Sequence, residues 1–278
     1  MVERAALADA IYRAVGEAAV TLRPDVRSAL ATALESEPSA RGRSVLAQLL
    51  ENADVARMDR VPVCQDTGTA WIRVELGVDS RLPDDIQQLA DEAVASAYRD
   101  FALRMSTVRD ALFDRANRGD NTPAFVDVRL RPGSGARVEV MLKGGGSDNA
   151  SALAMLPPSA GIQGVREFVM STVEAKATGA CPPLVIGVAV GGTFDTVAAM
   201  AKKALLREVG SPASSPEAGA FERELLAAVN ATGIGPAGLG GRTTALAVHL
   251  VTAPCHIAAL PVAVNLGCCA VRSAIVEV

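Results

Sequence analysis

The stretch at residues 62–68, Pro-Val-Cys-Gln-Asp-Thr-Gly, places a thiol, an amide, a carboxylate and a hydroxyl in consecutive positions before a glycine. Groups that need polar partners are unusual in a core strand, so this pattern indicates a loop that holds a ligand. The thiol of Cys64 can become a thiolate that binds a soft metal. Gln65 and Asp66 can orient a polar ligand, and Gly68 lets the backbone approach it closely. The alternative is a buried cysteine beside an ordinary Asp-Thr-Gly turn.

The number and spacing of the other cysteines indicate which kinds of metal or redox site Cys64 could belong to. The five stand at positions 64, 181, 255, 268 and 269, an odd number without any C-x-x-C spacing. This arrangement argues against a disulfide framework, a zinc ribbon and a ferredoxin run. Only two histidines exist, which leaves little for a histidine metal site or a Ser/His/Asp triad. Cys255 beside His256 could form a reactive pair, but we interpret Cys255 as a buried small thiol.

Cys64, Cys181 and Cys268 share a sequence context, because each lies beside proline or glycine and next to a strand-like stretch. Three thiolates suit an iron–sulfur cluster that leaves one iron without a protein ligand, whereas an electron carrier takes four cysteines. An open iron can bind the hydroxyl and carboxylate of a 2-hydroxy acid and act as a Lewis acid in its dehydration. Only the fold can bring such distant residues together, and three structural cysteines are the alternative.

Two further segments contain residue types that bind anions. Residues 104–123 combine several arginines with aspartates, which indicates either a solvated loop or a substrate-facing segment that offers Arg104 or Arg109 to carboxylates. Residues 143–149 read Lys-Gly-Gly-Gly-Ser-Asp-Asn, and three successive glycines can present bare amide groups to an anion or form a flexible loop.

The elements around these segments mix helices and strands, so the fold class is α/β, with α+β as the alternative. The first 60 residues predict helices, and a mixed sheet with flanking helices follows. Pro83-Asp84-Asp85 predicts the start of a long helix. The alternation at 124–130 and 137–142 predicts two strands that form a hairpin. The last residues read as a short apolar tail. Gly191-Gly192-Thr193, between a strand and a helix, is typical of either phosphate binding or close helix–strand packing.

Composition excludes several classes of protein. A net charge of −4 argues against a nucleic-acid surface, and no run of about 18 apolar residues could span a membrane. Charged residues interrupt the first 22 positions, which excludes a signal peptide and predicts a cytoplasmic protein.

Several of these motifs together resemble the class I, iron–sulfur fumarate hydratases, whose α-subunit family includes L(+)-tartrate dehydratase. The resemblance covers nearly the whole chain in order. It rests on residues 62–68, Arg-x-Ser-x-Val-x-Asp from Arg104, Gly-Asp-Asn-Thr-Pro at 119–123, residues 143–149, Cys-Pro-Pro from Cys181, residues 191–193, and Leu-Pro-Val-Ala-Val-Asn at 260–265.

The resemblance implies one catalytic domain over residues 1–278, with a helical part at 1–60 and a cluster- and substrate-binding part at 61–278. It implies a 4Fe–4S cluster held by Cys64, Cys181 and Cys268. A dicarboxylate would face Arg104, which clamps one carboxylate, and Asp66, which lies near the site of proton transfer. The remaining contacts would come from Gln65 and from the amides of Gly144, Gly145 and Gly146. A salt bridge at a helix end is the alternative role for Arg104.

The sequence departs from the family pattern around the third cysteine. Gly267 replaces the usual glutamine, Cys269 follows, and Arg272-Ser273 stands where two arginines are usual. Either Cys268 or Cys269 could therefore be the ligand, and Cys268 keeps the register. The family's β-type domain, which carries a catalytic threonine, has no copy here. The chain is thus expected to be an α subunit in a hetero-oligomer, completed by a separate β subunit.

The expected activity is the reversible hydration of fumarate to malate, with L(+)-tartrate dehydration as the alternative. Two other classes remain open from the sequence. A nucleotide-binding module would use residues 191–193, and a non-catalytic scaffold would have lost its cluster.

Overall fold

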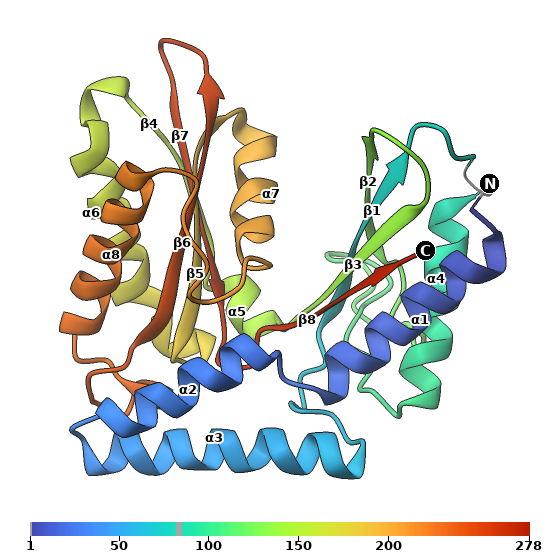
Figure 1. The fold of residues 1–278 in the computed structure, drawn as a ribbon, viewed down its shortest axis with the longest axis horizontal. Coiled ribbons are helices and arrows are strands. Elements are labelled where there is room, and N and C mark those ends of the chain that lie inside the picture. Colours follow the sequence, from blue (N-terminus) through green and yellow to red (C-terminus); the bar gives the residue numbers. More distant parts are fainter. Residues whose placement is uncertain (1, 82–84) are drawn as a thin grey trace. The chain divides into compact units, whose positions relative to one another are not determined.

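The computed structural model describes residues 2–81 and 85–278, and it forms two compact units that each contain a four-stranded sheet (Figure 1). Unit 1 comprises the described residues up to Arg23 together with Asn52–Gly145 and Arg272–Val278. Unit 2 comprises Pro24–Glu51 and Gly146–Val271. Two mixed sheets flanked by helices confirm the predicted α/β class. That the two units act as one catalytic domain stays a prediction.

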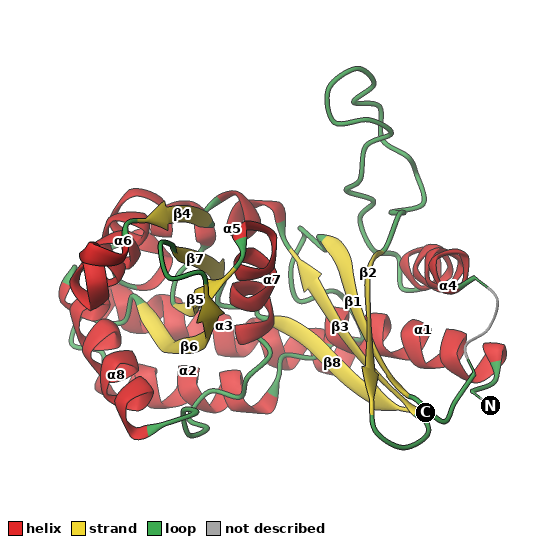
Figure 2. Cartoon of the chain, turned by 90° about the horizontal axis from the view of Figure 1, so that it is seen from above, coloured by secondary structure: helices red, strands yellow, loops and turns green. Residues whose placement is uncertain are grey.

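The sheet of unit 1 has the strand order β2-β1-β3-β8, with β1 parallel to β2 and antiparallel to β3. Two helices pack against it and against each other, and Figure 2 shows both on the same side of the sheet. Apolar side chains from this helix layer and from the sheet form the core of the unit. The elements are α1 (Arg4–Val20), β1 (Thr69–Gly77), α4 (Ile86–Asp100), β2 (Phe125–Arg131), β3 (Ala136–Lys143) and β8 (Arg272–Glu277).

The predicted hairpin is wrong, because β2 and β3 do not pair with each other. Trp71 of β1 lies opposite Phe125 of β2 on one side and opposite Met141 of β3 on the other. Strand β1 is buried along most of its length and takes the central position. Alternation within two segments that follow each other in the sequence indicates that each is a strand, but it does not show that a third strand lies between them.

The predicted apolar tail is a strand. β8 pairs antiparallel with β3, from Leu142 opposite Arg272 to Arg137 opposite Glu277. The end of the chain therefore completes the sheet that begins with β1, and it places Arg272 beside the strand that leads to the glycine-rich segment at 143–149.

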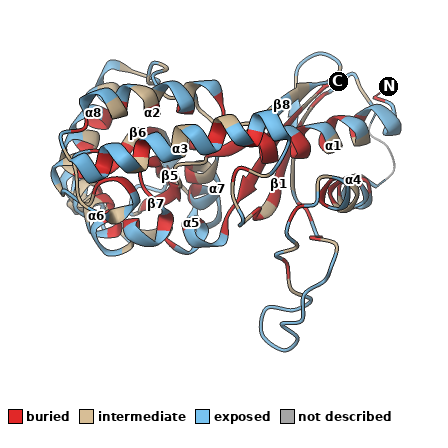
Figure 3. Ribbon diagram, turned by 90° about the horizontal axis from the view of Figure 1, so that it is seen from below, coloured by how far each residue is buried: buried red, intermediate tan, exposed pale blue. Residues whose placement is uncertain are grey.

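The sheet of unit 2 has the order β4-β7-β5-β6, in which β5 is parallel to β6 and antiparallel to β7. Helix α7 covers one face, and α6 and α8 cover the other (Figure 1). Figure 3 shows the buried strands between these helices. The elements are α2 (Pro24–Ser36), α5 (Gly145–Asn149), β4 (Ala152–Leu156), α6 (Gly161–Lys176), β5 (Leu184–Gly192), α7 (Phe194–Ala204), α8 (Pro216–Ala231), β6 (Ala245–Cys255) and β7 (Leu260–Gly267), with short 3₁₀ turns at Pro158–Ala160, Ala177–Ala180 and Pro236–Gly238.

The long helices agree with the sequence pattern, whereas the short α5 forms in the glycine-rich segment, where no helix was predicted. Together, α1, α2 and α3 (Ala40–Asp59) form the predicted helical N-terminal region. Asp85 begins α4, since its side chain accepts a hydrogen bond from the amide of Gln88 at 2.9 Å. Pro83 and Asp84 of the predicted start lie outside the described residues. Within the described ranges, none of the helices combines the length and hydropathy that crossing a membrane requires.

The two glycines at the end of β5 fit the packing interpretation. Gly191 has φ +96°, and a Cβ there would lie 1.9 Å from the carbonyl oxygen of Ala253 in β6. Thr193 begins α7 with a reciprocal capping box to Thr196. Close backbone contact and helix capping therefore account for these three residues without a phosphate.

A buried carboxylate holds the start of β6 in unit 2. Glu37, just after α2, is 2% exposed and accepts hydrogen bonds from the amide and hydroxyl of Thr243, both at 2.8 Å. The amides of Arg242 and Ser39 also donate to it. Burial raises the pKa of Glu37, but these hydrogen bonds outweigh burial, and the net pKa lies below its ordinary value of 4.5.

We predict that Glu37→Gln lowers the free energy of unfolding by about 1–3 kcal/mol at neutral pH, because an amide NH₂ then faces backbone donors. A lowered native pKa stabilises the fold above pH 4.5, and this contribution is lost as the pH falls through the native pKa. The difference between wild type and variant should therefore be largest above about pH 5 and shrink in acid. Urea unfolding across pH measures it, and a difference that does not change with pH would contradict the assignment.

Candidate functional site

The loop that contains Cys64 is anchored within unit 1 between α3 and β1. The amide of Val63 donates to the carbonyl of Ala19 at 2.9 Å, and the side chain of Asn52 donates to the carbonyl of Val63 at 2.8 Å. Beyond these anchors, Cys64 is half-buried and Gln65 is exposed. The backbone is thus held while both side chains remain accessible to a ligand.

Asp66 joins this loop to the glycine-rich segment. Its Oδ1 accepts from the amide of Gly68 at 3.1 Å, and its Oδ2 accepts from the amide of Gly145 at 2.8 Å. A Cβ at Gly144 would lie only 2.9 Å from Asp66 Oδ2, so a side chain there would displace the Asp66 carboxylate. The structure therefore brings Asp66, Gly144 and Gly145 together. The segments 62–68 and 143–149, which are far apart in the sequence, were expected to meet.

Arg104 lies at the base of the long loop between α4 and β2, which extends away from the sheet of unit 1 in Figure 2. The hydroxyl of Thr67 donates to the carbonyl of Arg104 at 2.7 Å, and Asn121 donates to the carbonyl of Gly68 at 3.0 Å. The loop base is therefore hydrogen-bonded to the Cys64 loop. The guanidinium of Arg104 is exposed and forms no ion pair with any described residue, which contradicts the alternative of a helix-end salt bridge.

Tyr98 supports the same loop from beneath, a role that the sequence pattern did not reveal. Its hydroxyl lies 3.0 Å from the carbonyl of Thr67 and 2.9 Å from that of Gly68. Burial raises the pKa of Tyr98 well above its ordinary value of 10, and the positive charge of Arg272 opposes this only in part. The phenol therefore stays protonated and serves as a donor to the loop backbone.

Cys181 and the pair Cys268-Cys269 lie on adjacent turns of unit 2. Cys268 follows β7 directly, and the amide of Cys269 donates to the carbonyl of Cys181 at 3.0 Å. Cys181 has a left-handed backbone, with φ 56° and ψ 71°, and an exposed side chain. Gly146 belongs to the same neighbourhood, because a Cβ there would lie 2.8 Å from the carbonyl oxygen of Gly179.

Cys64, Cys181 and Cys268 are free thiols, which suits ligands of an iron–sulfur cluster. Their positions within each unit also fit this role. All five cysteines are described, and none forms a disulfide. Two of the three predicted ligands come from hydrogen-bonded turns of unit 2, and the half-buried Cys64 comes from an anchored loop of unit 1. The described ranges contain no gathered group of three or more His, Cys, Asp and Glu side chains that could hold a metal ion. The convergence of Cys64, Cys181 and Cys268 therefore stays a prediction.

The interpretation of Cys255 as a buried thiol is wrong. Cys255 is exposed at the end of β6, and its thiol donates to the carbonyl of Ala259 at 3.2 Å. His256 accepts from the amide of Ala258 at 3.1 Å. Both side chains bond to the backbone of their own turn, and a local turn accounts for them.

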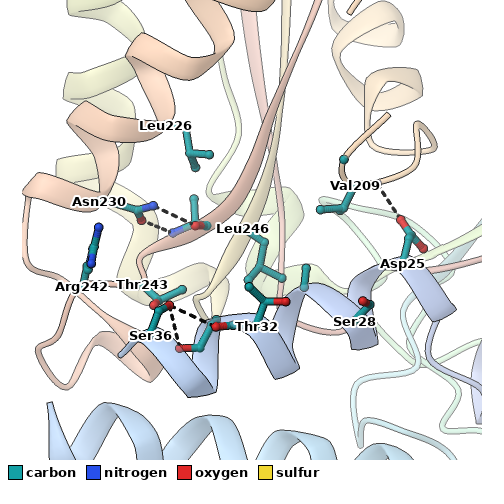
Figure 4. A pocket seen from close by; sticks show the side chains of 14 residues that line it. Asp25, Ser28, Thr32, Ser36, Val209, Leu226, Asn230, Arg242, Thr243 and Leu246 are labelled. Atoms are coloured by element: carbon teal, nitrogen blue, oxygen red, sulfur yellow. Dashed lines mark hydrogen bonds between the residues drawn. The ribbon is translucent and has the colours of Figure 1, made fainter. Parts of the chain in front are cut away.

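A cavity of about 490 Å³ in unit 2 lies between α2 and β6 (Figure 4). Its polar groups hold backbone: Asp25 accepts from the amide of Val209 at 2.8 Å, and Asn230 bonds to the amide and carbonyl of Ala245. Ser36 donates to the carbonyl of Thr32 in its own helix. The residues that line this cavity include no cysteine and none of the predicted site residues. This cavity is therefore not where the candidate chemistry lies.

Comparison with known proteins agrees with the motifs. The family model for fumarate hydratase (Fumerase) matches residues 8–277. A Methanocaldococcus jannaschii protein, provisionally named as L(+)-tartrate dehydratase subunit alpha, is 37% identical over 97% of this chain and 96% of its own length. The L(+)-tartrate dehydratase subunit alpha of Escherichia coli K12 is 33% identical over 89% of this chain and 82% of its own.

A further L(+)-tartrate dehydratase subunit alpha, from Escherichia coli strain UTI89, is 34% identical over the same shares of the two chains. The family and these names agree on a hydro-lyase, and the word alpha in the names implies a separate second subunit. Since the family match covers nearly every residue, the chain belongs to the fumarate hydratase (Fumerase) family.

Proposed function

We propose that this chain is the α subunit of a hydro-lyase that dehydrates L(+)-tartrate, and that a separate β subunit completes the active site. The observation that carries the proposal is the 33–37% identity to L(+)-tartrate dehydratase α subunits over most of the chain. These relatives favour tartrate over fumarate, which the motifs alone had put first. Fumarate hydration is the second candidate, because the matching family is named for it.

A 4Fe–4S cluster would be held by Cys64, Cys181 and Cys268. When bound, it would supply an open iron that acts as a Lewis acid toward the departing hydroxyl. The support from this chain is the set of accessible thiols outside any disulfide, two of them on hydrogen-bonded turns. A reducing compartment such as the cytoplasm would keep these thiols available.

The protein groups around this centre would bind and orient the dicarboxylate. Arg104, exposed and without an ion pair among the described residues, would hold one carboxylate through two parallel hydrogen bonds. Gln65, which is exposed in the anchored loop that contains Cys64, would orient a hydroxyl or carboxylate. The glycines 144–146 would bring backbone amides close to the ligand, although the amide of Gly145 already donates to Asp66.

Asp66 would move a proton between the substrate and the protein. Its two oxygens accept from backbone amides, which fixes the orientation of the carboxylate. A general base needs such fixed geometry within hydrogen-bond reach of the proton that it takes. The partner subunit would supply the remaining groups.

Parallel assays of the anaerobically purified αβ complex test the proposal. L(+)-tartrate and malate differ by one hydroxyl, and a site built to bond that hydroxyl rejects the analogue that lacks it by about 10⁴-fold. We therefore expect oxaloacetate formation from tartrate with a much larger kcat/KM than fumarate formation from malate. Faster turnover of malate would instead favour the fumarate hydratase, and turnover of neither acid would reject the hydro-lyase.

A further inference from the structure

Arg272, at the start of β8, is a charged side chain that is fully buried and incompletely bonded. It is 1% exposed, and neither its Nε nor its Nη1 has a hydrogen-bond acceptor among the residues that the structure describes. Buried polar groups are almost always hydrogen-bonded, and burying a charge without a partner is costly. This guanidinium therefore needs an explanation that packing alone does not give.

Its position puts the charge beside Asp66. A Cβ added to Gly144 would lie 2.9 Å from Asp66 Oδ2 and 3.4 Å from Arg272 Nη2, so both groups border the same point. The two oxygens of Asp66 already accept from the amides of Gly68 and Gly145. The charges of Arg272 and Asp66 also both act on Tyr98. We call Asp66, Gly144, Gly145 and Arg272 the Asp66 corner; all four belong to unit 1.

A second buried arginine in the same sheet shows how a guanidinium with a structural role is hydrogen-bonded in this fold. Arg73 of β1 is 5% exposed, and it bonds to Asp127 Oδ2 through Nε at 3.0 Å and through Nη2 at 2.8 Å. It also lies over the ring of Trp71. Arg272 forms no such ion pair with a carboxylate of the residues that the structure describes, although it occupies the same sheet.

We propose that Arg272 is a positioning residue for an anionic ligand: its positive charge prepares the Asp66 corner for one carboxylate of a dicarboxylate. The inference rests on the proposed function for the class of ligand, and on the unsatisfied guanidinium for the site. Without a ligand, two nitrogens of the buried guanidinium have no acceptor among the described residues, which lowers stability. A bound carboxylate at the corner supplies oxygen acceptors and a further negative charge.

The test compares Arg272→Met, Arg272→Lys and the matched control Arg73→Met in the αβ complex. The probe is succinate, a dicarboxylate without a hydroxyl that could leave. Calorimetry gives its dissociation constant, and thermal unfolding without ligand gives the melting temperature. For Arg272→Met we expect succinate binding weaker by about 10- to 100-fold, the factor that losing hydrogen bonds to a charged group produces. The melting temperature should stay equal or rise, because a buried guanidinium with unsatisfied donors is replaced by an apolar group of similar length.

Arg272→Lys keeps the charge and should restore part of the affinity. Arg73→Met should behave in the opposite way, with a lower melting temperature and unchanged succinate binding, because it removes the buried partner of Asp127 and leaves that carboxylate paired with the more exposed Arg129. A merely structural role for Arg272 would lower the melting temperature as Arg73→Met does. Such a loss, unchanged affinity in Arg272→Met, or a wild-type complex that does not bind succinate would each overturn the inference.

The outcomes separate this inference from the proposed function. If succinate binds through Arg272 but the complex dehydrates neither tartrate nor malate, the hydro-lyase proposal fails and the role of Arg272 stands. If the complex dehydrates tartrate and Arg272→Met leaves both KM and succinate binding unchanged, the function stands and the role of Arg272 is rejected.

Discussion

Replacing Cys181 with serine is expected to remove most of the iron from the αβ complex and to lower its hydro-lyase activity by at least about 10³-fold. A Lewis-acid metal contributes several kcal/mol to stabilising the transition state, and about 1.4 kcal/mol corresponds to a factor of ten in rate. A serine hydroxyl is a much poorer ligand for iron than a thiolate. Iron and sulfide analysis of anaerobically purified protein, beside an activity assay, measures both effects.

The other cysteines provide the controls for this experiment. Cys64→Ser should act as Cys181→Ser does, and Cys255→Ser should change neither iron content nor activity, since Cys255 bonds to its own turn. Iron content that survives in Cys64→Ser and Cys181→Ser would reject the predicted ligand set.

The third ligand can be identified in the same way. Cys268 directly follows β7, and Cys269 bonds through its amide to the carbonyl of Cys181. That amide contact does not require the thiol of Cys269, so Cys269→Ser should keep its turn and its iron. We expect Cys268→Ser to lose iron, and the reverse result would assign the ligand to Cys269.

Asp66→Asn is expected to lower kcat by about 10²- to 10⁴-fold, the usual contribution of a positioned acid or base. The amide cannot take a proton from the substrate, and its NH₂ group would face a backbone donor, at Gly68 or at Gly145. Succinate binding should fall much less than kcat, because Arg104 and Arg272 retain their charges. Steady-state kinetics together with calorimetry separates the two effects.

Asp85→Asn is the matched control for this substitution. Asp85 also accepts from a backbone amide, but at the start of α4, and asparagine begins helices equally well. It should therefore leave kcat unchanged. A loss of kcat in Asp66→Asn no larger than in Asp85→Asn would remove Asp66 from the proposed chemistry.

Local sequence patterns were sufficient for most helices and strands. The pattern that predicted helices over the first 60 residues matches α1, α2 and α3, and the alternation at 124–130 and 137–142 matches β2 and β3. Both patterns report how one segment is buried, which depends on its own residues. The predicted hairpin failed because strand order depends on which distant strand provides the better partner, and no single segment contains that information.

Some residues of the candidate site could be recognised from the sequence, and others could not. The motif at residues 62–68 and the glycines at 143–149 were recognisable because they place polar or flexible residues where packing does not need them. The role of Tyr98 and the burial of Arg272 beside Asp66 were not recognised, since a tyrosine within a helix and an arginine near an apolar end have ordinary structural uses. The available signals for Arg272 were its charge in an otherwise mostly apolar tail and its position where the family pattern has arginine.

By itself, the sequence determined the class of fold, the family and the residue types that could bind a metal and an acid, because these depend on composition, periodicity and motifs. Only the tertiary structure decided that β8 returns to the sheet of β1, that Asp66 accepts from Gly145, and that Arg272 is buried beside them. The reason is physical: hydrogen bonds and charge compensation between residues 79 positions apart or more depend on how the chain packs, and no local pattern encodes that distance.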